Sequence, residues 1–249
     1  MKRVIGAVFL LFGTFLLTFP FVSGFFRGLS DEQEQGQYEA QAAPDPDAVR
    51  WNEELSFLSE LSEEEKETYQ ALLDPLGTGM MGTVEIPKLD VSLPIYHGVE
   101  DITLASAVGH LPGSSLPTGG AGNHVILAAH SGLATADYFS RIGTLTEGDR
   151  FQIRAMGETM VYEVIQIQEV YPEELDVLKQ TDDDLVTLVT CTPPGANTKR
   201  LLVTGRRCMG TVGVKSIRTD LSFVAALVAW MAVFRLVFRI FSERSERNA

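Results

Sequence analysis

Residues 185–207 read LVTLVTCTPPGANTKRLLVTGRR, and this stretch decides the fold. A β-branched run ends at Cys191, a loop with two prolines and a glycine follows, and a second apolar run begins at Arg200. Two such runs joined by turn-forming residues predict a β-hairpin. If the runs pair across the loop, Cys191 lies opposite Arg200, and directly opposed residues have Cβ atoms about 4.5–5.5 Å apart.

An arginine beside a cysteine suggests nucleophilic chemistry. The guanidinium favours the thiolate form of the cysteine and can stabilise negative charge on a carbonyl oxygen under attack. In the same register Cys208 lies on the order of eight residues along the hairpin, and at about 3.3 Å per residue the two sulfurs are too far apart to bridge. Cys191 is therefore the predicted nucleophile, and Cys208 is expected outside the site.

A cysteine nucleophile needs a proton partner, and His130 is the candidate. It ends the apolar run HVILAAH at a turn, and a strand end can deliver a side chain to a cleft while the strand holds it in place. The competing histidines lie beside glycine or in loop-like sequence: His97, His110 and His124. From the residues alone the alternative stays open, because a single cysteine at a strand end is most often a small core residue.

The sequence around this hairpin predicts a mainly β domain. From residue 82 onward, short β-prone runs such as TVEIP, HVILAAH and RFQIRAM alternate with Gly, Pro, Asp and Asn. Several runs alternate apolar and polar residues, which is typical of an antiparallel sheet closed into a barrel or a sandwich. We assign residues 80–212 to this catalytic domain.

Both ends of the chain carry apolar runs. Residues 4–26 contain no charge and follow Lys2 and Arg3, so residues 1–28 are expected to form a transmembrane anchor, with a cleaved signal peptide as the alternative. Residues 221–241 contain arginines only near their end, and a basic tail follows. We expect residues 213–249 to form a second transmembrane helix with a cytoplasmic tail, and an amphipathic surface helix is the alternative.

Two segments connect the anchor to the predicted barrel. Residues 29–50 are polar, acidic and interrupted by two prolines, which predicts a flexible stalk. Residues 51–79 carry Trp51 and several leucines near helical spacing between glutamates, which predicts a helical extension, as one helix or two short ones, packed on the domain. With basic residues at both ends of the chain, the positive-inside rule places both termini in the cytoplasm and the domain between them outside.

Composition excludes several classes of function. The net charge is −13, from 20 Lys and Arg against 33 Asp and Glu, so a nucleic-acid partner is not expected. Two cysteines make no disulfide framework, and no C-x-x-C pair indicates zinc. Phosphate-binding and dinucleotide-binding glycine motifs are absent from the sequence. We therefore expect neither a cofactor nor a metal.

Four segments together resemble the sortase family. TLVTCTPPGANTKRLLVTGRR is similar to the sortase signature T-L-x-T-C followed by a loop and an arginine. GTVEIPKLDVSLPIYHGVED, AVGHLPGSSLPTGG and NHVILAAHSGL resemble the corresponding sortase segments in the same order. The two terminal apolar runs and the T-C-T-P opening are most similar to class C, the pilus-assembling subgroup.

The resemblance implies an eight-stranded sortase-type β-barrel with a few short helices, and it implies a cysteine transpeptidase. Cys191 would be the nucleophile, His130 the proton partner and Arg200 the stabiliser of the oxyanion. The substrates would be secreted proteins with C-terminal L-P-x-T-G-like sorting signals, with the acyl group passed to a pilin lysine. The location would be the membrane of a Gram-positive-type cell envelope, with the lipid bilayer as a further partner.

This sequence departs from the family pattern at two motifs. The family's histidine is commonly followed by Arg-Gly, where this chain has Ser131, and its loop commonly reads T-P-Y-G, where this chain has Pro194. Asp74-Pro75-Leu76 is the nearest match to a class C lid over the cysteine, but it lacks the aromatic residue and is also explained as a turn. Two other functions stay open: a housekeeping sortase that joins proteins to a cell-wall precursor, and a non-catalytic membrane-tethered scaffold.

Overall fold

The computed structural model describes residues 2–105, 107–131, 139–193, 195–212, 225 and 228–235. The chain divides into two compact units. The first contains residues 1–30 and 216–249, and the second contains residues 31–215. All strands described below, and the predicted site, belong to the second unit.

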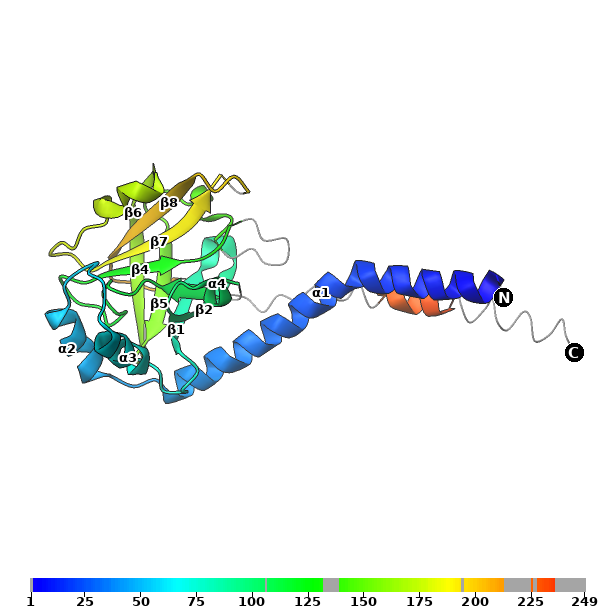
Figure 1. The fold of residues 1–249 in the computed structure, drawn as a ribbon, viewed down its shortest axis with the longest axis horizontal. Helices are drawn as coiled ribbons and strands as arrows, with labels where there is room; N and C mark the ends of the chain where they lie inside the picture. Colours follow the sequence, from blue (N-terminus) through cyan, green and yellow to red (C-terminus); the bar gives the residue numbers. More distant parts are fainter. Residues whose placement is uncertain are drawn as a thin grey trace, which may run out of the picture. The chain divides into compact units, whose positions relative to one another are not determined.

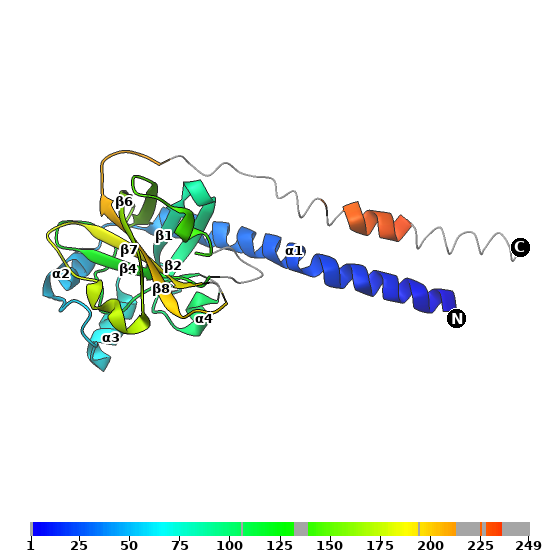
Figure 2. The same ribbon diagram turned by 90° about the horizontal axis from the view of Figure 1, so that it is seen from above.

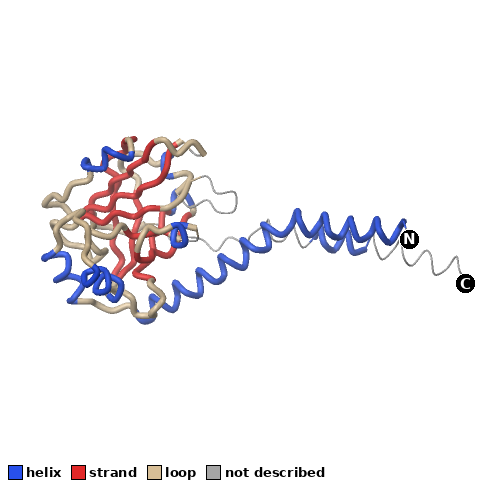
Figure 3. Tube along the Cα trace, viewed as in Figure 1, coloured by secondary structure: helices blue, strands red, loops and turns tan. Residues whose placement is uncertain are grey.

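Eight strands of the described chain close into a barrel, in the order β1-β2-β3-β4-β7-β8-β6-β5 (Figures 1 and 3). Their bounds are β1 Met80–Ile86, β2 Val91–His97, β3 Val108–His110, β4 His124–Ala128, β5 Arg150–Ala155, β6 Glu158–Val170, β7 Leu185–Thr192 and β8 Lys199–Arg207. The pairs β2–β3 and β4–β7 are parallel, and the other neighbouring pairs are antiparallel. The predicted mainly β, eight-stranded barrel is confirmed.

The interior of the barrel is filled by the apolar side chains that alternate inward along each strand. Phe151 and Tyr162 stack there with ring centroids 5.7 Å apart. Gly205 lies against these rings, and a Cβ atom built on it would come within 2.6 Å of the Phe151 ring. Only glycine therefore lets β8 pass over this part of the core.

A second, smaller apolar cluster lies on the other face of the same strands. Its buried members are Ile126, Val170, Leu178 and Leu202, and Phe57, Leu111 and Val189 pack against it. The sequence neighbours of these residues, such as Leu127, Leu188 and Val203, belong to the main core instead. Because side chains alternate between the faces of a strand, the small cluster lies on the outer face of the barrel.

Apart from the end of α1 (Lys2–Gln41), the helices of the second unit are short, as predicted. They comprise α2 Pro46–Glu54, α3 Glu63–Ala71, α4 Asp101–Leu104, and the 3-10 helices η1 Pro87–Leu89, η2 Ile142–Thr144 and η3 Pro172–Val177. Asp45 caps α2, and Ser62 with Glu65 forms a capping box on α3. The helical extension is thus two helices, α2 and α3, which lie beside the barrel (Figure 2). Ala48 of α2 and Tyr69 of α3 join the core.

The segment expected as a flexible stalk, residues 29–50, is instead mostly helical. Helix α1 runs without interruption from Lys2 to Gln41, and α2 begins at Pro46. Tyr38 is 2% exposed, and its hydroxyl donates to the Met81 carbonyl at 2.6 Å. Glutamate, glutamine and alanine are good helix formers, and the buried tyrosine fixes the end of α1 on the barrel.

The membrane-spanning predictions concern the first unit. Among the described residues, no helix combines the length and the apolar character that crossing a membrane requires. Most of residues 213–249, the predicted second span, lies outside the described residues; residues 225 and 228–235 are helical. Within this unit, the Trp230 indole donates to the Thr18 hydroxyl at 2.8 Å.

Candidate active site

Strands β7 and β8 form the predicted hairpin in the predicted register. Cys191 pairs directly with Arg200, and Thr192 pairs with Lys199 across the loop. Both Cys191 and Arg200 are half-buried. A thiol and a guanidinium are thus held on neighbouring strands by a continuous backbone ladder.

His130 reaches the same place from β4, which runs parallel to β7. The last paired residues are Ala128 and Val189, and the Ala129 N–H then donates to the Val189 carbonyl at 3.1 Å. His130 and Cys191 each lie two residues beyond the Ala128–Val189 pair. Neighbouring strands are about 4.8 Å apart, so the two side chains leave adjacent strand ends.

Cys191 and Arg200 lie on the outer face of the barrel, and His130 follows the adjacent strand end of β4. Side chains two residues apart on a strand point to the same face. Cys191 therefore shares its face of β7 with Val189, and Arg200 shares its face of β8 with Leu202. Ala128, two residues before His130, pairs with Val189. Val189 and Leu202 belong to the outer apolar cluster. Strands β4, β7 and β8 lie side by side (Figures 1 and 2). Their ends therefore bring a cysteine, a histidine and an arginine together beside the outer apolar cluster.

The other three histidines are engaged elsewhere. Burial lowers the pKa of His110 to about 4, and its ring contacts the Tyr69 hydroxyl and the Ser115 carbonyl, both at 2.9 Å. Burial also lowers the pKa of His124, whose ring nitrogens bond the Lys179 carbonyl and the Thr187 hydroxyl, both at 2.7 Å.

His97 also differs from His130 in its surroundings. Burial lowers the pKa of His97, and its Nδ1 lies 2.9 Å from the Gly79 carbonyl. Its ring packs edge-on against Tyr69, with centroids 4.7 Å apart. Of the four histidines, His130 is the one that follows the end of β4, next to the end of β7 that carries Cys191.

Arg200 is held by the loop that joins its own hairpin. Its Nη1 donates to the carbonyls of Asn197 and Lys199, at 3.2 Å each. Both bonds come from one nitrogen of a group that has five N–H donors. A guanidinium placed in this way can still present its other nitrogens to an anionic oxygen.

Two hydroxyls at the site bond to backbone carbonyls across the β4–β7 pair. Thr190 is 4% exposed and donates to the Ala129 carbonyl at 2.8 Å, which is a structural role between the strands. Ser131 donates to the carbonyl of Cys191 at 2.7 Å. In the sequence, Ser131 stands out only because the family commonly has arginine at this position. That difference does not predict the hydrogen bond to Cys191.

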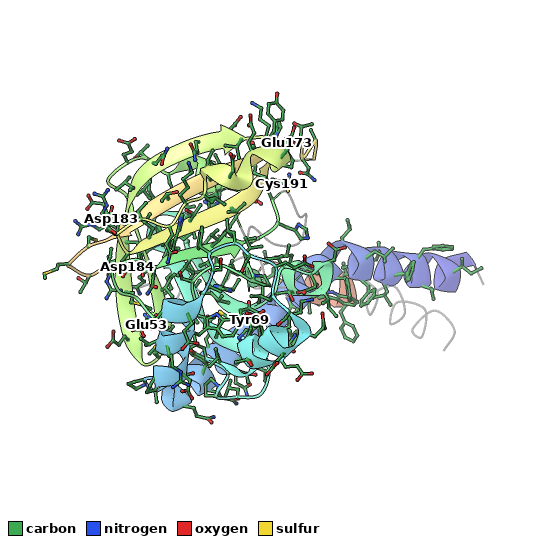
Figure 4. The ribbon with its side chains drawn as sticks, turned by 60° about the vertical axis from the view of Figure 1, so that its left-hand side comes forward. Glu53, Tyr69, Glu173, Asp183, Asp184 and Cys191 are labelled. Carbon is green, nitrogen blue, oxygen red and sulfur yellow. The ribbon has the colours of Figure 1, made fainter. Side chains whose placement is uncertain are left out.

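Two further predictions concern residues around the site. Asp74 accepts from the N–H groups of Thr78 at 3.0 Å and Gly79 at 2.9 Å, so Asp74-Pro75-Leu76 forms a side-chain-stabilised turn before β1. Cys208 follows β8, at the end of the hairpin where Arg207 bonds the Asp184 carbonyl, and both cysteines are free. Figure 4 shows Cys191 and Asp184 at opposite ends of β7.

A closed eight-stranded barrel that presents a cysteine, a histidine and an arginine from three adjacent strands fits a cysteine transpeptidase. Comparison with known families agrees: the Sortase domain model matches residues 84–208, half of the chain. The chain belongs to the sortase family, whose members are cysteine transpeptidases. Within the described ranges, no group of three or more His, Cys, Asp or Glu side chains is arranged to hold a metal ion.

Solved structures named sortase C are similar to this chain. Sortase C-1 from Actinomyces oris is 41% identical, with 66% of this chain and 97% of that chain covered and a TM-score of 0.62. Sortase C1 from Streptococcus agalactiae is 36% identical, with coverage of 73% and 92% and a TM-score of 0.63. A curated relative, Sortase A of Listeria monocytogenes, is 23% identical over 210 residues, which are 82% of this chain and 90% of the relative.

Proposed function

We propose that this sortase is a membrane-anchored pilin polymerase. It would cleave an L-P-x-T-G-like sorting signal of a secreted protein and join the new carboxyl end to a lysine of a pilin subunit. The observation that carries the proposal is the juxtaposition of Cys191, Arg200 and the His130 strand end. The similarity to sortase C structures supports the choice of a pilin as substrate.

The first half-reaction forms a thioester. The Cys191 thiolate attacks the scissile carbonyl carbon, and a C–S bond forms. Arg200 stabilises the oxyanion of the tetrahedral intermediate. The C–N bond then breaks, and His130 donates a proton to the leaving amine.

The second half-reaction resolves the thioester. The amine of the acceptor lysine transfers a proton to His130 and attacks the same carbonyl carbon. A new C–N bond forms, the C–S bond breaks, and the Cys191 thiolate is regenerated. The product is an isopeptide bond between two protein chains.

The outer apolar cluster supports recognition of an apolar residue in the sorting signal. Val189 lies two residues before Cys191 on β7, and Leu202 lies opposite Val189 on β8. Both belong to the cluster that contains Ile126 and Leu178. A leucine side chain upstream of the scissile bond would contact the partly exposed members of the cluster, Phe57, Leu111 and Val189, and would bury apolar area there at roughly 25 cal/mol per Å² removed from water.

Membrane anchoring is the second part of the proposal. The apolar runs of residues 1–28 and 213–249 and their flanking basic residues support a lipid-bound enzyme with an extracellular catalytic domain and cytoplasmic termini. A reporter enzyme fused after Ala249 should be active only in the cytoplasm, while a tag placed after Ala42 should be accessible from outside. An externally accessible Ala249 would contradict two membrane spans.

A housekeeping role is the second candidate function, and the curated relatives named Sortase A favour it. In that role the acceptor would be the amine of a cell-wall precursor. A non-catalytic scaffold is a weaker alternative, because the Cys, His and Arg side chains all remain in place at the site.

The deciding experiment offers both acceptors to the same thioester. Full-length enzyme in detergent is incubated with a sorting peptide and equal concentrations of a pilin subunit and a cell-wall precursor peptide. Mass spectrometry should identify the peptide joined to a pilin lysine. Joining to the precursor peptide alone would establish the housekeeping function, and absence of any thioester on Cys191 would establish the scaffold.

A further inference from the structure

Ser131 connects the two strand ends that carry the proposed catalytic residues. It directly follows His130, and its hydroxyl donates to the backbone carbonyl of Cys191 at 2.7 Å. Ser131 is half-buried. One short hydrogen bond therefore joins the neighbour of the proposed proton partner to the main chain of the proposed nucleophile.

The geometry of the ladder explains why a side chain makes this bond. In a parallel pair, hydrogen bonds from one strand recur every second residue. The Ala129 N–H donates to Val189 at 3.1 Å, so a continued ladder would next join Ser131 to Cys191. Strand β4 ends at Ala128, and at the next position the Ser131 hydroxyl donates to the Cys191 carbonyl.

His130 is thereby bracketed by contacts to β7. Before it, the Ala129 carbonyl accepts from the buried Thr190 hydroxyl at 2.8 Å. After it, Ser131 donates to Cys191 at 2.7 Å. The residues on either side of His130 are thus held against two consecutive residues of β7, and the second of these is the nucleophile.

We propose that Ser131 is a positioning residue for the acyl-transfer reaction: its hydroxyl sets the separation between His130 and Cys191. This proposal rests on the proposed roles of His130 and Cys191. Proton transfer depends steeply on the placement of the two groups. The Ser131 O–H is already donated to the Cys191 carbonyl, so we do not expect it to bind the sorting signal. Loss of the hydroxyl should therefore lower kcat and leave KM for the peptide unchanged.

The test compares three variants of the full-length enzyme in detergent. Ser131→Ala removes the hydroxyl, and Ser131→Thr keeps a hydroxyl at the same position. Ser59→Ala is the matched control, because Ser59 makes the same kind of bond, to the Ser56 carbonyl at 2.7 Å, in the exposed segment between α2 and α3. Thioester formation with a sorting peptide is measured by quenched-flow mass spectrometry over a range of pH.

Ser131→Ala should lower kcat about 3- to 10-fold, the factor that corresponds to one neutral hydrogen bond. Its KM should match the wild type, and its pH–rate profile should change because His130 moves relative to the thiol. Ser131→Thr should restore most of kcat, and Ser59→Ala should match the wild type throughout.

Three results would overturn the proposal: wild-type kcat in Ser131→Ala, an equal loss in Ser59→Ala, or a loss that only follows the fraction of unfolded protein. Each of these requires that the wild type forms the thioester. A wild-type enzyme that forms none would refute the proposed function instead, so the two failures are distinguishable.

Discussion

Cys191 and Arg200 are direct partners across the β7–β8 hairpin, and Arg200 also donates from Nη1 to the loop carbonyls of Asn197 and Lys199. The arginine is therefore oriented from both sides, by its strand and by its loop. The test for Arg200 must therefore separate the planar guanidinium group from its positive charge.

Arg200→Lys should slow thioester formation about 10²- to 10³-fold, the usual cost of losing an oxyanion donor. Lysine keeps the charge but lacks the planar fork, which can bond the loop and an oxyanion together. Arg206→Lys on the same strand is the control, because Arg206 pairs with Asp183 at 3.1 Å on the surface. Stopped-flow acylation with a sorting peptide measures both variants. Equal rates in the two lysine variants would refute a role for the fork.

His130→Ala should reduce thioester formation about 10²- to 10⁴-fold, the range for lost acid–base help. The single-alanine variants of His97, His110 and His124 should retain activity wherever circular dichroism shows that they fold, because these rings are engaged with other groups. A wild-type rate in His130→Ala, together with loss in another folded histidine variant, would identify that other histidine as the proton partner.

Cys208→Ala should leave acyl transfer within about twofold of the wild type, the scatter expected for a surface substitution away from the site. The Cys208 N–H donates to the Val161 carbonyl, beyond the end of β8 that is distant from the Cys191–Arg200 pair. Peptide mass mapping of the trapped thioester should find it on Cys191 in both proteins. An inactive but folded Cys208→Ala protein would contradict a single nucleophile.

Stability should fall as the pH decreases from about 6.5 toward 4, in part because of His110. Burial lowers the pKa of His110 to about 4, below the value of about 6.5 for an unfolded histidine. The unfolded chain therefore binds more protons in this window, so stability present above pH 6.5 is lost as the pH falls, by at most about 3 kcal/mol. The groups that face the ring are Tyr69, Ser114, Ser115 and the histidine at position 97.

Urea titrations between pH 7 and 4.5 measure this dependence. His110→Gln should be less stable at pH 7 and should show a flatter dependence of the unfolding free energy on pH. Ser59→Ala is the control, because it changes an exposed residue without a titratable group, and it should keep the wild-type slope. An unchanged slope in His110→Gln would assign the acid sensitivity to other groups.

Tyr38→Phe should destabilise the second unit by about 1–3 kcal/mol, because it leaves the Met81 carbonyl without the buried hydroxyl that donates to it at 2.6 Å. Tyr171→Phe is the control, since Tyr171 is 49% exposed. Chemical denaturation gives the free energies, and hydrogen exchange of residues 31–41 should report the release of this end of α1. Unchanged protection there would mean that the hydroxyl does not hold α1 in place.

The sequence by itself determined a mainly β domain, as a barrel or a sandwich, and the Cys191–Arg200 register. Both depend on local pattern: alternating strands, turn residues and a loop short enough to bring adjacent runs together. The resemblance to sortases narrowed the architecture to the eight-stranded barrel. Alternation also assigns residues to faces once the strands are known, which is why Val189 and Cys191 could be expected on one side. The family signature supplied the histidine, but no local rule paired it with the cysteine.

Only the tertiary structure decided how the more distant segments meet. His130 approaches Cys191 because β4 pairs in parallel with β7, a contact between runs about 60 residues apart that no short-range pattern specifies. The acidic segment before α2 continues helix α1, and the burial of Tyr38 against the barrel holds the end of that helix in place. The Ser131–Cys191 bond likewise exists only where two strand ends are brought together, since the hydroxyl bonds to water in the unfolded chain and only folding places the Cys191 carbonyl beside it.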